Sequence, residues 1–184
     1  ASVDPKLGTV FYSLPQEQTS KPQFVREGST CLVCHDSASI TGGVPGLIMR
    51  SVLPDRYGYS MATLRDGPTT DQMPLDQRWG GWYVTGTHGE QAHMGNVMAP
   101  VLTHEAGNPR TYMDRVGVKR EAIVTDLSGR FDTEPYLSPH SDIAALMVFA
   151  HQTHVHNLIT IANYETRKAL YEDALHATRA ALAE

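Results

Sequence analysis

Two cysteines and a histidine within one short stretch constrain this chain more than any other feature. The pentapeptide Cys31-Leu32-Val33-Cys34-His35 contains both cysteines of the sequence. C-x-x-C-H is the pattern through which c-type haem is attached, because the two thiols form thioethers with the vinyl groups and the adjacent imidazole binds the iron. The motif therefore predicts one covalently bound haem c, with Cys31, Cys34 and His35 as its attachment and iron-binding residues.

Other uses of a C-x-x-C pair fit this sequence less well. A four-thiolate zinc site is impossible, because the chain has only 2 cysteines. A thioredoxin-like dithiol belongs in a βαβ context, and no such pattern lies near the motif. A disulfide between Cys31 and Cys34 would close a very small loop and contribute little stability. Histidines three apart, such as His151 and His154, suggest a non-haem metal site, but no carboxylate lies at a matching helical step.

Charge and hydropathy narrow the class of protein. A formal net charge of −5 and a pI near 6.0 argue against nucleic acid and anionic membrane surfaces as partners, and they suit a basic redox partner. A hydrophobic content of 41% is enough for a core. No apolar run approaches the roughly 20 residues of a membrane span. Since haem is attached to such motifs outside the cytoplasm, we expect a periplasmic or otherwise exported chain that has lost a leader before Ala1.

Local patterns predict the elements around the motif. A short helix is expected to carry the motif through about Asp36, after an extended piece at 9–14. Ser138 and Pro139 are expected to begin a long helix that reaches about Ala183, with one break near Asn163 and one apolar stripe on it. The stripe comprises Ile143, Leu146, Met147, Ala150, Leu158 and Ile161. The predicted fold is mainly α with extensive irregular loops, in one domain made of 1–137 and 138–184.

Two further blocks resemble known proteins. Residues 78–96 (RWGGWYVTGTHGEQAHMGN) and 139–167 resemble segments of uncharacterised bacterial cytochrome-c-like proteins that carry C-x-x-C-H upstream. The resemblance implies an exported mono-haem c-type cytochrome, with a cytochrome-c-like core enlarged by the Gly- and aromatic-rich block and the long helix. In class I relatives a proline carbonyl in the loop after the motif accepts the other N–H of the proximal histidine. The resemblance therefore implies this role for Pro45, with an ordinary turn as the alternative.

The sixth ligand of the iron has several candidates. His93 and Met94 lie about 60 residues after His35, which is the distance seen between motif and ligand in many relatives. His151 lies at the edge of the predicted apolar stripe. We therefore rank His93 first, then Met94 and His151, then His88. Core filling is the simpler explanation of a methionine, and a hydrogen-bonded histidine is the commoner outcome in a core.

These observations predict an electron carrier, in which one haem exchanges single electrons with redox partner proteins. The alternative is a haem enzyme or small-ligand sensor with an open distal position on the iron. There His93, His88 or His151 would act as a hydrogen-bond donor or general acid. A haem-bearing structural subunit is a third possibility.

Overall fold

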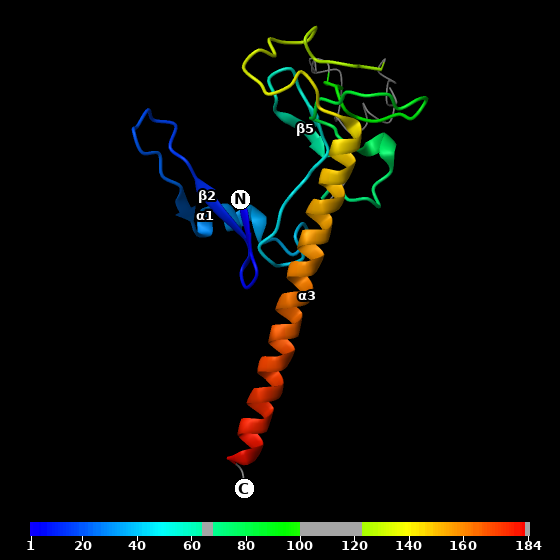
Figure 1. Cartoon of the computed structure of the whole chain (residues 1–184). Coiled ribbons are helices and arrows are strands. Elements are labelled where there is room, and N and C mark those ends of the chain that lie inside the picture. The colour runs from blue at the N-terminus through cyan, green and yellow to red at the C-terminus, as the bar shows by residue number, and fades with distance from the viewer. Residues whose placement is uncertain (64–67, 100–122, 183–184) are drawn as a thin grey trace. The chain divides into compact units, whose positions relative to one another are not determined.

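The computed structural model describes residues 1–63, 68–99 and 123–182 (Figure 1). The chain divides into two compact units, which are described separately below. Unit 1 comprises Ala1–Ile48 and His154–Glu184, and unit 2 comprises Met49–Thr153. The two parts expected from the sequence, 1–137 and 138–184, do not coincide with these units, because the long helix contributes to both.

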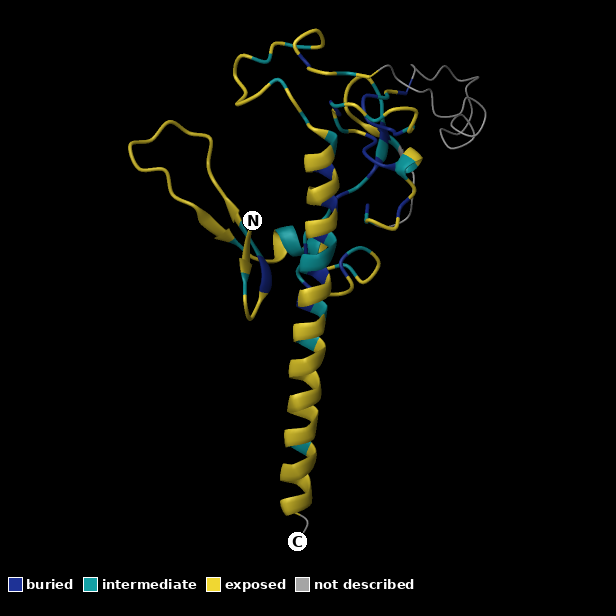
Figure 2. Ribbon diagram, turned by 45° about the vertical axis from the view of Figure 1, so that its right-hand side comes forward, coloured by how far each residue is buried: buried dark blue, intermediate teal, exposed yellow. Residues whose placement is uncertain are grey.

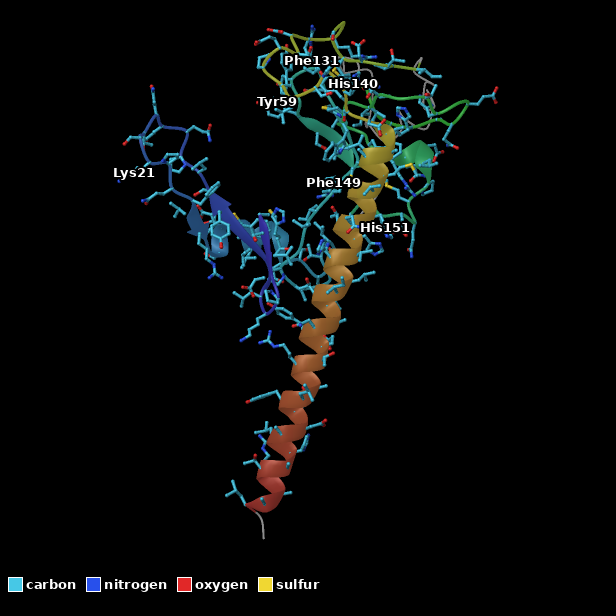
Figure 3. All side chains as sticks on the ribbon, viewed as in Figure 1. Lys21, Tyr59, Phe131, His140, Phe149 and His151 are labelled. Carbon is cyan, nitrogen blue, oxygen red and sulfur yellow. The ribbon has the colours of Figure 1, made fainter. Side chains whose placement is uncertain are left out.

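Unit 1 begins with a three-stranded antiparallel sheet in the order β1-β2-β3. The strands are β1 (Ser2–Asp4), β2 (Gly8–Ser13) and β3 (Val25–Glu27). Strand β2 falls on the extended piece predicted at 9–14, where β-branched and aromatic residues favour a strand. Asp4 closes the turn between β1 and β2, since its Oδ1 accepts hydrogen bonds from the amides of Lys6 (2.8 Å) and Leu7 (2.9 Å). Lys21 lies on the loop that joins β2 and β3 (Figure 3).

Helix α1 (Ser29–His35) and the loop after it complete the N-terminal part of unit 1. The loop approaches the side chains of helix α3 (Ile143–Ala181) so closely that two of its positions have no room for a Cβ. A Cβ on Gly42 would lie 2.5 Å from Ile161 Cδ1, and one on Gly46 would lie 2.6 Å from Asn157 Oδ1. Glycine at these positions therefore allows the loop after the motif to pack directly against α3.

Unit 2 has a two-stranded antiparallel sheet and two apolar clusters. The sheet pairs β4 (Val52–Pro54) with β5 (Ser60–Thr63), and a short 3-10 turn, η1, covers Leu75–Gln77. The larger cluster contains the buried residues Met49, Trp79, Val84, Leu146 and Ala150. The first turns of α3 therefore supply part of the core of unit 2. The second cluster contains Leu53, Met94 and Ala99.

Helix α3 begins later than the sequence predicted. Its first amide groups are capped by Asp142, whose Oδ1 accepts a hydrogen bond from Ala145 N at 2.9 Å. Ser138 does not cap α3, since its Oγ accepts from the amide of His140. The helix then runs for 39 residues without the break that Asn163 had suggested.

The buried face of α3 differs from the predicted apolar stripe. Leu146 and Ala150 of the predicted stripe are buried, whereas Met147 and Leu158 are 45% and 50% exposed and polar side chains occupy the other buried positions. The buried residues of the helix are Leu146, Ala150, Thr153, Asn157 and Thr160. Beyond Tyr164 the described part of the helix is exposed at every position except Leu175 (Figure 2). Neither described helix combines the length and apolar content needed to cross a bilayer.

The prediction of a mainly α fold was wrong. The two described α-helices cover 7 and 39 residues, so that with η1 they account for about a third of the described residues. Five short strands among the described residues form two small antiparallel sheets. Within the part of the chain that the structure describes, α-helix is confined to the motif and the C-terminal segment, because glycine, proline and turn-forming aspartate interrupt much of the sequence between them.

Candidate haem attachment site

The three motif residues lie on one face of α1. Cys31 and Cys34 are three positions apart and Cys31 and His35 are four apart, which are the spacings of neighbours on a helix surface. Asp36 ends the helix, and its amide donates to Leu32 O at 3.0 Å. The two thiols and the imidazole can therefore approach one flat molecule from the same side.

The surface around the motif is accessible and apolar. Both cysteines are free thiols; Cys34 is exposed and Cys31 is partly buried. Helix α1 has no buried residue, and Val33 is 78% exposed. Phe24 and Val25, which precede the helix, are 73% and 52% exposed. Exposed apolar side chains in and before α1 are typical of a surface that a bound group or partner covers.

The ring of His35 is held by the loop after the motif. Its Nδ1 lies 2.9 Å from the carbonyl oxygen of Gly46, and the Gly46 amide donates to His35 O at 2.8 Å. A carbonyl can only accept, so Nδ1 carries the proton and Nε2 keeps the lone pair. The ring of Phe11, on β2, lies 4.4 Å from the His35 ring between centroids. His35 is thus oriented from two sides with Nε2 as its ligand atom.

The carbonyl that meets His35 is not the one expected from the resemblance. Pro45 O accepts a hydrogen bond from Thr9 N at 3.1 Å, and the next carbonyl along the chain, that of Gly46, faces the imidazole. Pro45 therefore connects the loop to β2, and the Gly46 carbonyl is the group that accepts from His35 Nδ1. Successive carbonyls of an extended loop point in different directions, so a shift of one residue changes which carbonyl reaches the ring.

A cavity of about 450 Å³ lies beside these residues within unit 1. Phe11, Leu32, Pro45 and Tyr164 supply apolar walls, and Arg26 and Glu27 supply its charged edge. The volume is in the range of ordinary small-molecule sites.

The candidates for a sixth ligand lie in unit 2. His93 is one of the buried candidates. His93 is 6% exposed, and its Nδ1 accepts a hydrogen bond from Gly95 N at 3.0 Å. Its ring meets those of Trp79 and His88 edge-on, with centroid distances of 5.8 and 4.6 Å. Because Nδ1 accepts, the proton of the neutral ring is on Nε2, which is the opposite arrangement to that of His35. His93 is thereby prepared to donate a hydrogen bond from Nε2 rather than to coordinate a metal through it.

Met94 and His151 have different surroundings. Met94 is 1% exposed and packs with Leu53 and Ala99, so it fills a core of its own unit. His151 is on the surface of α3, with its side chain 54% exposed and its Nδ1 4.0 Å from Asp71 Oδ2 (Figure 3). The guanidinium of Arg78 also donates a hydrogen bond to the backbone oxygen of Asp71. Burial lowers the pKa of Arg78.

His88, the fourth candidate from the sequence, has the tautomer that suits a ligand. Its Nδ1 lies 2.8 Å from Gln91 O, so Nδ1 is the donor and Nε2 keeps the lone pair. Among the described residues, no three His, Cys, Asp or Glu side chains converge as they would around a non-haem metal.

Sequence reasoning missed two residues of the site. These are Gly46, whose carbonyl faces His35, and Asn157, which is hydrogen-bonded to the loop. Of the two, only Gly46 could have been found from the sequence, because a glycine after a proline indicates a position where chains approach closely. No family model, curated protein or solved structure matches the chain. The likeness to cytochromes therefore depends on the motif and the two blocks of sequence.

Proposed function

We propose that this chain is an exported, periplasmic mono-haem c-type cytochrome that carries single electrons between redox partner proteins. The observation that supports the proposal most directly is the geometry of α1, with two free thiols and the Nε2 lone pair of His35 on one helical face. When bound, haem supplies an iron that accepts one electron from a donor and passes it to an acceptor.

Each motif residue has a defined task. Cys31 and Cys34 would hold the haem through thioethers, each thiol adding across one vinyl double bond with its hydrogen going to the second vinyl carbon, so that no oxidant would be needed. His35 would bind the iron through the Nε2 lone pair. The Gly46 carbonyl, 2.9 Å from Nδ1, keeps the ring in the required tautomer and raises its basicity.

The test is to produce the full chain in a host that exports it and attaches haem. We expect the purified polypeptide to be heavier by one haem, and its colour to resist extraction by acidified acetone. The double variant Cys31→Ser/Cys34→Ser should lose both properties, while His176→Ala, a change on the exposed end of α3, should keep them. A wild-type mass equal to that of the bare polypeptide, or pigment that acetone removes, would refute the proposal.

A second function is favoured by one specific observation, the Nε2–H of His93. A donor of this kind suits a ligand such as peroxide or a nitrogen oxide on an open distal position, as in a haem enzyme or sensor. Addition of carbon monoxide to the reduced protein separates the two functions. A sharp low-spin spectrum that the gas leaves unchanged favours electron transfer, and a rapid spectral change favours the open site.

Variants then identify the sixth ligand in the electron carrier. The tautomers predict that His88→Ala makes the reduced protein sensitive to carbon monoxide, because Nε2 of His88 is an acceptor. Met94→Leu, which preserves an apolar side chain of similar size in the second cluster, should leave the spectrum unchanged. The reverse pattern would establish methionine ligation.

A further inference from the structure

A buried asparagine of α3 is hydrogen-bonded to the loop that follows the haem motif. Asn157 is 6% exposed. Its Oδ1 accepts from Leu47 N at 2.8 Å, and its Nδ2 donates to Leu47 O at 2.8 Å. The amide therefore satisfies both backbone groups of one residue and has both of its own polar atoms paired. The two bonds are long-range in sequence, since 110 positions separate the partners.

Leu47, the residue to which Asn157 is hydrogen-bonded, directly follows Gly46, whose carbonyl orients His35. The Gly46 carbonyl faces His35 Nδ1 at 2.9 Å, while the Gly46 amide donates to His35 O at 2.8 Å. A Cβ on Gly46 would lie 2.6 Å from Asn157 Oδ1, so the asparagine lies directly against this peptide. The preceding carbonyl, that of Pro45, is bound by β2. Three consecutive residues are thus fixed by β2, α1 and α3.

We propose that Asn157 is a positioning residue for the proximal histidine, and that it lowers the reduction potential of the haem by holding the Gly46 carbonyl on His35 Nδ1. This inference rests on the proposed function. A strong hydrogen bond at Nδ1 makes Nε2 more basic, and a more basic ligand stabilises ferric over ferrous iron. Without Asn157, the hydrogen bonds described for residues 45–47 come only from β2 and α1. The carbonyl then moves from its position and the bond weakens.

The test compares Asn157→Leu with Asn163→Leu in the full haem-loaded chain. Asn163 is a matched control, because it is an exposed asparagine of the same helix whose Nδ2 contacts Pro5 O at 3.4 Å. For Asn157→Leu we expect a shift of about tenfold in the ferric–ferrous equilibrium toward the ferrous form, which for one electron is about 59 mV. Resonance Raman should show a lower iron–histidine stretching frequency, and hydrogen exchange should be faster at Leu47 N. The control should match wild type in all three measurements.

A purely structural role predicts a different outcome. Faster exchange at Leu47 with an unchanged potential and an unchanged iron–histidine frequency would overturn the inference, although the proposed function would stand. Absence of covalent haem from the wild-type chain would instead remove the proposed function itself.

A second variant keeps the test decisive if Asn157→Leu does not fold. Asn157→Asp preserves size and the acceptor for Leu47 N, but sets a carboxylate oxygen against Leu47 O. Its potential should exceed that of wild type while the carboxylate is ionised, and return toward wild type at the lower pH where a protonated carboxyl again donates. Asn163→Asp controls for the added charge. A potential that follows wild type at every pH would refute the positioning role.

Discussion

Asn96 is the residue of unit 2 whose replacement tests the structure most sharply. Its side chain pairs with both backbone groups of Val84: Oδ1 accepts from Val84 N at 2.9 Å and Nδ2 donates to Val84 O at 2.8 Å. Its own amide donates to Trp82 O at 2.9 Å. The backbone of Asn96 is left-handed, with φ at +66°. Asparagine suits the position twice, as a double hydrogen-bond partner and as a residue that tolerates this conformation.

The cost of Asn96→Ala follows from these contacts. Two intramolecular hydrogen bonds contribute about 2 kcal/mol in total, and Val84, which is 2% exposed, keeps polar groups that water cannot reach. A residue with a Cβ in the left-handed region adds about 1 kcal/mol. We therefore expect Asn96→Ala to lower the free energy of unfolding by about 3 kcal/mol. Asn96→Gly loses the bonds but not the backbone fit, and should cost about 2 kcal/mol.

Urea denaturation followed by tryptophan fluorescence measures the difference. Both tryptophans, Trp79 and Trp82, lie in unit 2, so the signal reports on that unit. The midpoint should fall with an unchanged slope, because the surface exposed on unfolding is the same. Asn163→Ala, on the exposed part of α3, should stay within about 0.5 kcal/mol of wild type. If Asn96→Ala also stays within about 0.5 kcal/mol, the paired hydrogen bonds do not hold the unit together. Equal losses for alanine and glycine would refute the backbone argument.

Three smaller perturbations follow from the same structure. Gly95→Ala forces a Cβ against the Val84 side chain, so thermal unfolding should show a loss of about 1–3 kcal/mol. Asp142→Ala removes the side chain that accepts from Ala145 N, and circular dichroism of thermal unfolding should show a loss of about 1 kcal/mol. Hydrogen bonds from two turn amides lower the pKa of Asp4. Its contribution to the β1–β2 turn should therefore be complete above the unfolded value of about 3.9 and disappear as the pH falls through the lower folded value, as amide exchange in the turn can measure.

Local sequence signals predicted some elements and misplaced others. The extended piece at 9–14 became β2, and the motif lies on a short helix that ends at His35. The start of the long helix was wrong because Thr85 pairs with the segment that should have begun it. Thr85 N donates to Ser141 O at 2.8 Å and Ile143 N donates to Thr85 O at 2.9 Å. This pairing keeps the chain extended up to Asp142, where the sequence offers a second capping residue.

The packing of α3 shows why the predicted apolar stripe is only partly buried. A periodicity argument assigns burial to large apolar residues, which predicts that Leu158 is inside and Asn157 outside. The loop after the motif presents backbone rather than side chains to the helix, because Gly42 and Gly46 lie there. Backbone groups need a polar partner, so an asparagine is buried and the leucine beside it is exposed.

The spacing of the histidines in the sequence does not determine their ring tautomers. A neutral histidine can bind a metal through Nε2 when a carbonyl accepts a hydrogen bond from Nδ1–H. It is a hydrogen-bond donor through Nε2 when a backbone amide donates to Nδ1. His35 and His88 face carbonyls, whereas His93 faces the amide of Gly95. The deciding groups belong to the backbone, which carries no sequence signal. In the neutral rings, Nε2 therefore keeps the lone pair in His88 and carries the proton in His93, a difference that the ranking by spacing did not consider.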